Sequence, residues 1–449
     1  MIKEDDFSSI AGAAVDRAGH AGADMAEAYI SSGKELSIDV RNNCVETLKF
    51  AEDRGLGLRV IRGGRAGFSF STDLSSAGVA EAVQRALINC DQTAHDPYHR
   101  LPSPDQTYPE LSIYDPGIRA ATVEGKIELA KLMEQAALDY DPRVKIIESA
   151  TYQDGESLIT IVNSHGMSLT CRGGYCGVYL ALAASDGNDS QNGFALDYRL
   201  KYADLDPGKV GREAAHRAVR MLGAAPAPTR KTTIVLDPYV ATGFLVLAGP
   251  ALTSEAVQKG RSLFAGKVGS NVASSKITII DDGTLPNGIA STPFDGEGVA
   301  TSRNVLIING ELQGFLYDTY TAARDNLQST GNGVRSSFKG APEVGTTNFF
   351  IDNGATPFEQ LLKEIKSGLY ITGVMGLHTA NPISGDFSVG VSGLWIENGT
   401  LTKPMQGMAL GGNIINLLAS VEAVGDDLQF FGGKGSPTLR IAEMTVGGQ

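Results

Sequence analysis

The chain has 449 residues, of which 42% are hydrophobic and 20% are charged, a composition typical of two or three folded domains and not of a disordered protein. Its 38 Lys and Arg against 51 Asp and Glu give a net charge of −13, which repels phosphate and argues against a nucleic-acid partner. No apolar run approaches the roughly 20 residues of a membrane span, and the first residues lack a secretory signal pattern, so we expect a cytoplasmic protein without a membrane partner.

The first hundred residues predict a helix, an antiparallel meander and a second helix. Apolar residues at helical spacing predict helices over 7–21 and 77–88. Alternating segments between them predict strands at 35–41, 45–50, 57–62 and 65–71. A Gly-Gly turn at 63–64 connects the last two. Residues 92–117 are rich in Pro, Asp and Tyr, which indicates a linker, so residues 1–110 are assigned to a first α+β unit.

The same order repeats in residues 111–225. A helix is predicted at 123–140 and another at 208–222, and the strands between them at 145–152, 157–163, 167–171 and 177–184. Cys171 and Cys176 flank a predicted hairpin turn at 172–175, and we assign no metal or catalytic role to these thiols. The repeated order suggests two related units, each with an antiparallel sheet.

A linker at 223–230 combines small residues with Pro and separates these units from a β-rich C-terminal domain at 229–449. Helices are expected within it at 240–259, 357–367 and 408–421, and short strands at 232–236, 277–280, 304–308, 311–317, 348–351, 387–391, 393–396 and 438–441. Asn309-Gly310 and Asn398-Gly399 predict hairpin turns, because Asn-Gly supplies the positive φ of a type I′ turn. The pattern fits a barrel and a sandwich equally well.

A search for catalytic motifs gives little. The sequence has neither Gly-x4-Gly-Lys-Ser/Thr nor Gly-x-Ser-x-Gly, the marks of nucleotide binding and of many serine hydrolases. His95 and His99 are spaced like two ligands on one helix face, but Pro97 between them favours a surface loop. Asp281-Asp282-Gly283 is best explained as a turn at the end of a strand, with a cation site as the alternative.

The Gly-rich segment 329–337 contains Arg335. Its backbone N–H groups and the guanidinium could bind an anion, and a flexible loop at a subunit or peptide interface fits the same residues equally well. The sequence does not decide between these two interpretations.

Several motifs of the last domain together resemble the TldD/PmbA family, named for a proposed modulation of DNA gyrase. They keep their order along the chain: Lys259-Gly260-Arg261-Ser262, Phe264 to Gly269, Asp281 to Thr284, Asp295-Gly296-Glu297-Gly298, Asn309-Gly310, Thr330 to Gly333, Asn381 to Ser388 and Ile396 to Gly399. The resemblance implies cytoplasmic peptidase subunits of two types. The TldD type carries His-Glu-x-x-x-His before the Lys-Gly-x-Ser stretch and a Cys near the C-terminus, and these side chains suit zinc and a general base.

This chain departs from the TldD type at every ligand position. Counting back from Lys259 places the motif on 245–250, where Leu245 and Pro250 cannot bind zinc and Val246 cannot move a proton. No cysteine follows Cys176, and residues 430–435 occupy the corresponding C-terminal stretch. The chain therefore resembles the TldE/PmbA type, which implies no catalytic residue, metal or cofactor of its own and zinc only in a TldD-type partner. We expect the apolar segment to pack as a core helix.

The resemblance implies a non-catalytic subunit of a zinc metalloprotease acting on unfolded or leader peptides. An exposed strand edge could bind an extended peptide through main-chain hydrogen bonds. Arg335, Asn381 and Asp386 are the candidate contacts with a peptide or a partner. The alternative hypothesis is a homodimeric peptide-binding or regulatory protein that acts without a zinc partner.

Overall fold

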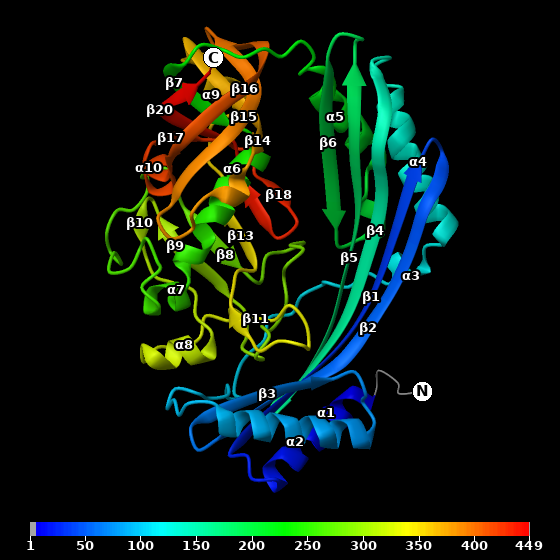
Figure 1. Ribbon diagram of the computed structural model, residues 1–449, viewed down its shortest axis with the longest axis vertical. Coiled ribbons are helices and arrows are strands. Elements are labelled where there is room, and N and C mark those ends of the chain that lie inside the picture. Colours follow the sequence, from blue (N-terminus) through cyan, green and yellow to red (C-terminus); the bar gives the residue numbers. More distant parts are fainter. Residues whose placement is uncertain (1–5, 449) are drawn as a thin grey trace.

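The computed structural model describes residues 6–448 and has a mixed α+β fold, as the sequence predicts. One half is a long, curved antiparallel sheet with helices on its outer side, and the other is a β-rich C-terminal domain (Figure 1). Residues 1–5, considered above for a signal sequence, and residue 449 lie outside the described range. Within residues 6–448, no helix combines the length and the apolar character that crossing a bilayer requires.

The sheet-bearing half consists of two units with the same order of elements. The first comprises α1 (Phe7–His20), β1 (Met25–Arg41), β2 (Cys44–Arg62), β3 (Arg65–Ser71) and α2 (Ser76–Gln92). The second comprises α3 (Gly117–Ala120), α4 (Val123–Leu138), β4 (Val144–Asn163), β5 (Ser168–Ser185), β6 (Ser190–Arg199), the 3-10 turn η2 (Tyr202–Asp204) and α5 (Pro207–Val219). Apart from the short α3 and η2, each unit is a helix, three strands and a helix.

The two units share one six-stranded sheet in the order β3-β2-β1-β4-β5-β6, joined by antiparallel pairing of β1 with β4. Because side chains alternate along a strand, even-numbered residues of β1 face the helices and odd-numbered residues face the C-terminal domain. Ile30 packs in a core with α1 and α2, and Ile38 in a core with α4 and α5. On the other face, Tyr29 packs with Phe294 and Phe338 of the C-terminal domain.

Several strands are longer than the sequence predicts. β4 joins the predicted segments 145–152 and 157–163, and β5 joins 167–171 and 177–184. The predicted hairpin turn at 172–175 is wrong, because these residues pair with residues 155–158 of β4 in a continuous ladder. Cys171 and Cys176 therefore lie in one strand on opposite faces of the sheet. Burial raises the pKa of Cys171 to about 11 and that of Cys176 to about 12.

Two glycines show that the units match in packing as well as in order. A Cβ at Gly67 of β3 would lie 2.1 Å from the carbonyl oxygen of Ala86 in α2. A Cβ at Gly193 of β6 would lie 2.2 Å from the carbonyl oxygen of Ala214 in α5. Both distances are far below van der Waals contact. In each unit the second helix can therefore lie against the outer strand only because that strand has glycine at the contact.

We expect Gly67→Ala to lower the free energy of unfolding by about 1–3 kcal/mol, because the added methyl group must displace α2. Gly12→Ala in α1 is the matched control: no heavy atom lies within 4 Å of its added Cβ. Alanine is favoured over glycine in a helix by about 0.5–1 kcal/mol, so this control should be neutral or stabilising. Urea unfolding measures both, and equal values for the two variants would contradict the close packing of β3 and α2.

The C-terminal domain contains a closed five-stranded barrel, which decides between the barrel and the sandwich. Its strands follow the order β16-β15-β14-β7-β20, and pairing of Ala409 with Gly447 closes β16 onto β20. The barrel strands are β7 (Arg230–Leu236), β14 (Ser367–Met375), β15 (Asp386–Glu397), β16 (Thr400–Asn413) and β20 (Leu439–Gly447), with β17 (Val421–Val424) paired to β20.

A second sheet of the same domain has the order β10-β9-β8-β13-β19-β18. Its strands are β8 (Ile279–Asp282), β9 (Arg303–Ile308), β10 (Glu311–Leu312), β13 (Asn348–Ile351), β18 (Gln429–Phe431) and β19 (Lys434–Ser436), and a separate ladder pairs β11 (Gly333–Val334) with β12 (Glu343–Val344). The helices are α6 (Pro238–Ala248), η3 (Gly249–Leu252), α7 (Ser254–Gln258), α8 (Thr319–Arg324), α9 (Phe358–Lys363), η4 (Leu377–Thr379) and α10 (Ile414–Ala419).

The predicted turns of this domain are confirmed, and two predicted helices are not. Asn309 and Asn398 both have φ 48°, as a type I′ turn requires. The helix predicted at 240–259 is divided into α6, η3 and α7, because Gly249-Pro250 interrupts it and the Thr253 side chain caps α7. Of the helix predicted at 408–421, residues 408–413 belong to β16, and the short α10 begins after the cap Asn413.

Candidate functional site

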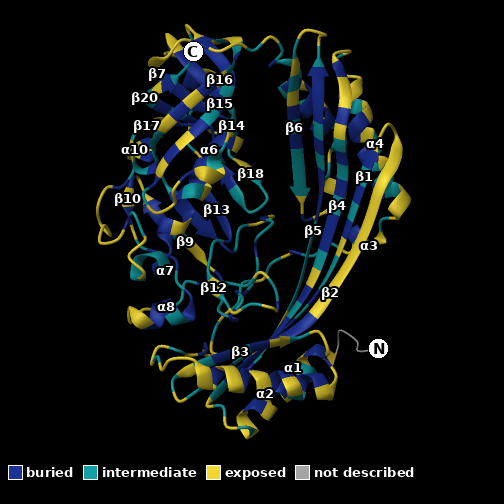
Figure 2. Ribbon diagram, viewed as in Figure 1, coloured by how far each residue is buried: buried dark blue, intermediate teal, exposed yellow. Residues whose placement is uncertain are grey.

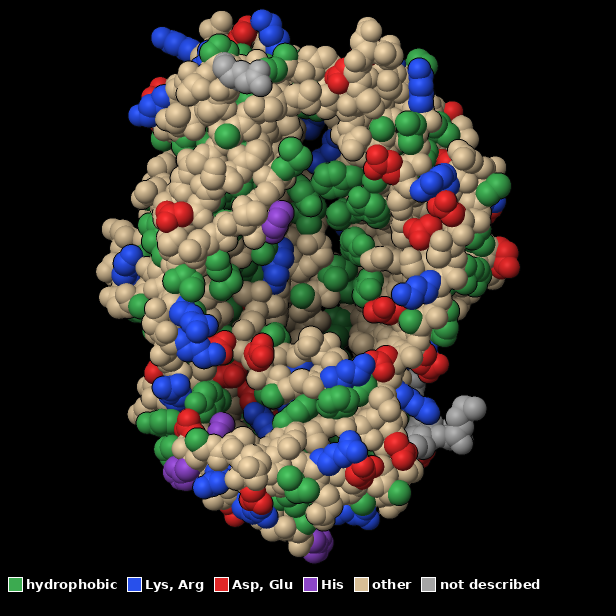
Figure 3. Space-filling model, viewed as in Figure 1, with side chains coloured by type: hydrophobic (Ala, Val, Ile, Leu, Met, Phe, Trp, Pro, Cys, Tyr) green, Lys and Arg blue, Asp and Glu red, His purple; other side chains and the backbone are tan. Residues whose placement is uncertain are grey.

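A hollow at the centre of the molecule separates the helix-free face of the long sheet from the C-terminal domain (Figure 3). Aromatic rings bridge one end: the ring of Tyr239 in α6 lies 4.9 Å from that of Phe194 in β6 and 5.1 Å from that of Phe431 in β18. Ion pairs between β1, β2 and the C-terminal domain bridge the other end. We call the space between these two bridges the central cleft.

Four charged side chains form the ion-pair bridge, three of them buried and the fourth, Arg59, 12% exposed. Arg59 of β2 contacts Glu27 of β1 at 2.9 Å and Glu297 of the C-terminal domain at 3.1 Å. Arg335 also pairs with Glu27, and its Nε donates to the carbonyl oxygen of Gly296 at 2.6 Å. The side chains of Glu27 and Glu297 are fully buried and that of Arg335 is 1% exposed. The four groups therefore neutralise one another across the domain boundary, away from water.

The motif Asp295-Gly296-Glu297-Gly298 supplies the C-terminal side of this bridge. Asp295 accepts hydrogen bonds from the backbone N–H groups of Gly333 and Val299, and Glu297 accepts one from that of Thr319. Burial raises the pKa of Glu297, and Arg59 opposes this shift. Burial and the charge of Glu297 also raise the pKa of Asp295. The motif therefore joins the two halves of the molecule.

Arg59→Met should destabilise the protein by about 3–5 kcal/mol at pH 8, because it leaves the buried carboxylate of Glu297 without a cation, while Glu27 keeps only Arg335. The loss should be smaller at pH 5. The folded-state pKa of Glu297 lies above its ordinary value of 4.5, so its contribution to stability is present below that value and falls as the pH rises. Removing Arg59 raises this pKa further, so the fall in stability becomes larger and extends to higher pH.

Urea unfolding of Arg59→Met at the two pH values measures this effect. Arg85→Met is the control, since Arg85 pairs with Glu81 on the surface with side chains 62% and 63% exposed and such pairs contribute less than about 1 kcal/mol. An equal loss of stability at both pH values would contradict the role given to Arg59.

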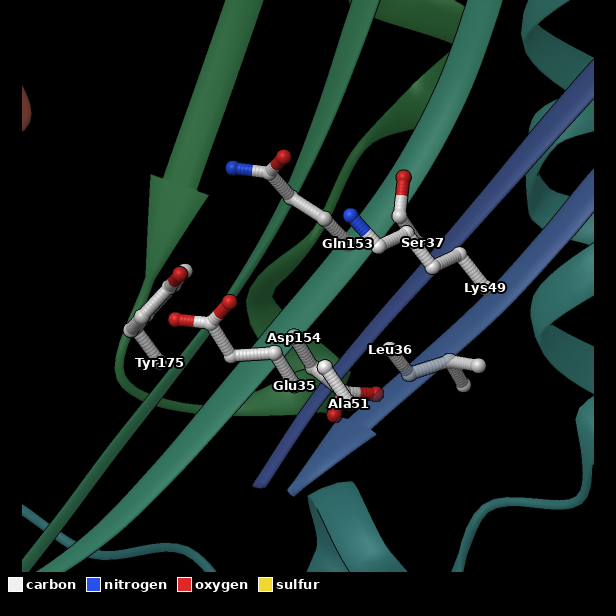
Figure 4. Close-up of a pocket in the computed structure, with 8 residues that line it drawn as sticks. All are labelled: Glu35, Leu36, Ser37, Lys49, Ala51, Gln153, Asp154 and Tyr175. Atoms are coloured by element: carbon white, nitrogen blue, oxygen red, sulfur yellow. The ribbon is translucent and has the colours of Figure 1, made fainter. Parts of the chain in front are cut away.

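A small pocket lies on the sheet, with a volume of about 190 Å³ (Figure 4). Its polar lining comes from four strands: Glu35 and Ser37 of β1, Lys49 of β2, Gln153 of β4 and Tyr175 of β5, with Leu36, Ala51 and Asp154 completing it. Glu35 and Tyr175 both lie opposite Gly155 of β4, two residues along the strand from Gln153, and in Figure 4 the side chains of Glu35, Gln153 and Tyr175 project to the same side. This places hydrogen-bonding groups on the cleft face of the sheet.

The groups around this pocket are suited to binding. The Gln153 amide donates to the hydroxyl of Tyr198 at 2.6 Å, and the rings of Tyr175 and Tyr198 lie 6.2 Å apart. Burial, followed by the charge of Glu35, raises the pKa of Tyr175, so the phenol stays protonated at neutral pH and can donate a hydrogen bond. Sequence patterns did not single out these residues, although the alternation of Glu35 and Ser37 with buried Leu36 and Ile38 marks a polar face.

The positions at which the resemblance implies a zinc motif lie on α6 and η3. Val246 is 45% exposed, Pro250 is exposed, and Leu245 is fully buried. Tyr239, Val246 and Pro250 are spaced by seven and four residues, which places them along one exposed side of the helix and its 3-10 extension. The predicted burial of this segment is therefore right for Leu245 and wrong for Val246.

The second stretch at which the resemblance implies a ligand, 430–435, lies beside α6. Its Phe431 contacts Tyr239, and β18 and β19 pack on the helix. The fold thus brings both stretches together, but with aliphatic and aromatic side chains that cannot coordinate zinc. Among residues 6–448, no group of three or more His, Cys, Asp and Glu side chains is arranged to hold a metal ion.

The three candidate contact residues do not form one site. Asn381 and Asp386 are exposed; Asn381 lies in the loop before β15, where its side chain accepts a hydrogen bond from the backbone N–H of Ile383, and Asp386 is the first residue of β15. Asp386 accepts a hydrogen bond from Asn413 at 2.9 Å. Arg335 lies elsewhere, in the buried ion-pair bridge, where its donors bind groups of this chain. The loop at 381–386 is accessible to a partner, and Arg335 is enclosed.

A larger pocket of about 470 Å³ lies on the outer side of the ion-pair bridge, between β3 and the helices α7 and α8. Arg59, His99 and Lys259 contribute to its wall. His99 stacks on Tyr320 with 5.1 Å between ring centres, and burial lowers its pKa. Lys259 of the Lys-Gly-Arg-Ser motif pairs with Glu255 at 2.5 Å. This motif therefore borders the junction between the halves and not the exposed side of α6.

Sequence models of three consecutive domains match the chain. They are PmbA/TldA metallopeptidase domain 1 over residues 26–90, the central domain over 116–222 and the C-terminal domain over 229–448. The three matches, in this order, give the chain the three-domain organisation that these models describe. Since the models cover most of the sequence, the chain belongs to the PmbA/TldD family.

Individual relatives agree with this assignment. Metalloprotease PmbA of Escherichia coli O157:H7 is 30% identical over 434 residues, which cover 95% of this chain and 93% of the relative. A metalloprotease TldD homologue of Haemophilus influenzae is 28% identical over 460 residues, covering 96% and 94%. Similarity therefore extends to relatives that bear either family name.

Solved structures share the fold over the whole length. A candidate modulator of a DNA gyrase from Thermotoga maritima superposes with a TM-score of 0.91 at 25% identity, covering 98% of this chain and 100% of that one. TldE from Thermococcus kodakarensis gives a TM-score of 0.89 at 24% identity, covering 97% and 99%. The latter likeness is one of fold alone.

Proposed function

We propose that this chain is a non-catalytic, PmbA/TldE-type subunit of a zinc peptidase whose metal ligands belong to a TldD-type partner. The side chains of α6 and η3 at the positions where the resemblance implies a zinc motif carry the proposal. Catalytic zinc sites in proteins use three His, Cys, Asp or Glu ligands and leave one position for water. Leu245, Val246 and Pro250 supply none of these, and the neighbouring Phe431 supplies none either.

Unfolded or leader peptides are the proposed substrates of the assembly. The names of the metalloprotease relatives support a peptide as the ligand class. The cleft face of the sheet supports an extended one, since Gln153 and Tyr175 offer hydrogen bonds to a backbone beside the open strand surface. In this proposal the chain holds or orients a peptide, and the partner cleaves it.

Co-expression with a TldD-type chain from the same genome tests the subunit role. The two chains should purify as a stable complex that contains about one zinc ion per pair and hydrolyses an unstructured peptide in a chelator-sensitive manner. The isolated chain should contain no stoichiometric zinc and should show no hydrolysis. Chelator-sensitive turnover with bound zinc in the isolated chain would overturn the proposal. Peptide binding by a partner-free dimer would favour the homodimeric alternative.

Variants of the sheet pocket test the contribution of this chain to peptide binding. Gln153→Ala and Tyr175→Ala should each raise the KM of the assembly for an unstructured peptide about threefold to tenfold, because each removes a hydrogen-bonding group. Tyr140→Ala is the matched control. Its side chain is 41% exposed and contacts His216 of α5 on the helix side of the sheet. Equal KM values for all three variants would exclude this pocket from the peptide site.

A further inference from the structure

The pocket on the cleft face of the long sheet contains a carboxylate beside an aromatic ring. Glu35 of β1 and Tyr175 of β5 flank the same residue of β4, Gly155. Because neighbouring strands are about 4.8 Å apart, the Cα atoms of Glu35 and Tyr175 are about 10 Å apart. Their side chains meet above Gly155, and in Figure 4 the Glu35 carboxylate lies beside Tyr175. One ligand group can therefore contact both side chains.

The glycine at position 155 makes this arrangement possible. A Cβ there would lie 2.5 Å from Cε1 and 2.9 Å from Cζ of Tyr175, so the ring lies across the backbone of Gly155. Any other side chain at this position would displace the ring. The ring is half-buried and forms part of the pocket wall, while Glu35 is exposed. The pair thus remains accessible from the cleft.

The same face of β1 already binds an arginine with the same two kinds of group. Arg335 pairs with Glu27, and its guanidinium lies 4.8 Å from the centre of the Tyr29 ring. Glu27, Tyr29 and Glu35 alternate along β1 and share its cleft face. A guanidinium suits such a pair because it stacks on a ring and donates to a carboxylate. Within residues 6–448, Glu35 has no ion pair with a cation of this chain.

The rest of the lining adds an acceptor and no competing carboxylate. The amide nitrogen of Gln153 donates to the hydroxyl of Tyr198 at 2.6 Å, so the carbonyl oxygen of Gln153 is the group that can accept from a ligand. Asp154 is fully buried and pairs with Lys126 at 2.6 Å, so its charge is already compensated. A ligand rich in donors therefore matches the pocket.

Lys49 is the cation in the lining, and its charge opposes a cationic ligand. It lies opposite Ser37, which is two residues along β1 from Glu35. Lys49 belongs to residues 44–54 of β2, all of which are exposed and appear in Figure 2 as a continuous yellow ribbon at the border of the sheet. Water therefore screens this charge. An acidic ligand would meet Lys49 but would also face Glu35.

We propose that this pocket binds the side chain of a basic residue, arginine in particular, of the peptide. The guanidinium stacks on Tyr175 and donates to the Glu35 carboxylate and to the carbonyl oxygen of Gln153. The volume of about 190 Å³ is below the roughly 300 Å³ of typical small-ligand pockets, which fits one side chain of a larger ligand. The net charge of −13 also attracts basic segments. This inference rests on the proposed peptide-binding role and adds a class of peptide to it.

Two peptides that differ only in charge test this selectivity. One is unstructured with a single arginine, and the other has citrulline, which is neutral and similar in shape, at that position. In fluorescence anisotropy the isolated full-length chain should bind the arginine peptide about tenfold more tightly. Glu35→Gln should bring this ratio close to one, and Lys49→Gln should increase it. Glu52→Gln is the matched control: Glu52 is exposed on β2 but lies opposite Lys34 on the helix side of the sheet, so the ratio should not change.

Variants of the ring test the stacking contact. Tyr175→Phe should keep the preference for arginine, and Tyr175→Leu should lower it about threefold, because leucine has no aromatic face. Equal affinity of the wild type for the two peptides, no binding of either, or a ratio that Glu35→Gln leaves unchanged would overturn the proposal. Tighter binding of a glutamate peptide that is lost in Lys49→Gln would also overturn it and would assign the pocket to an anion.

The result can be separated from the test of the subunit role. A zinc-containing complex that hydrolyses the arginine and citrulline peptides equally well would reject selectivity and keep the subunit role. Stoichiometric zinc and turnover in the isolated chain would reject the subunit role, while the ratio of the two affinities would still decide whether the pocket prefers arginine.

Discussion

Arg59 links the two halves of the molecule through contacts with Glu27 on one side and Glu297 on the other. A guanidinium suits this position because its planar array of donors can serve two carboxylates at once. The cost of removing these charges from water is offset only while every partner is present. The width of the central cleft therefore depends on an electrostatic contact at one end. β1 and β2 position this contact from one side, and the Asp-Gly-Glu-Gly motif positions it from the other.

The long sheet determines what each half can contribute. Its helix-covered face is filled by the two apolar cores of the α+β units, so this face stabilises the fold. Its other face remains free for contact with the C-terminal domain near Tyr29 and for the polar pocket around Gln153. The division follows from the alternation of side chains along strands that run through both regions. A single strand such as β1 thus contributes to the core, the domain junction and the pocket.

Much of the architecture could be predicted from the sequence, and the missing parts have physical causes. The helices α1, α2, α4 and α5 and the Asn-Gly turns were predictable, because their signals are local. β6 was not predicted, since Asn192 and Gly193 within it resemble a loop, and Gly193 is required by the packing of α5. The hairpin at 172–175 was predicted wrongly, because two glycines in a ladder look like a turn until the partner strand is known.

The candidate site could be predicted only in part. The resemblance places Leu245, Val246 and Pro250 at the positions of a zinc motif from the sequence alone, but the exposure of Val246 depends on packing around α6. Arg335 lies in a Gly-rich segment that has the composition of an anion site. The fold encloses it beside Glu27, a partner that the sequence does not reveal because it is 308 positions away along the chain. Charge pairs between distant segments leave no local pattern. This is why the ion-pair bridge could not be found without the fold.

The aromatic contact of Tyr239 with Phe194 and Phe431 has a consequence for access. The aromatic contact holds one end of the cleft and the ion-pair bridge holds the other. The long sheet and the C-terminal domain therefore cannot separate to admit a large ligand unless one of these contacts breaks. For the peptide ligand proposed above, such a frame would admit a narrow, unstructured segment from the side and would exclude a folded domain. A preference for flexible polypeptides would then follow from the two fixed ends of the cleft and not from the ligand's side chains.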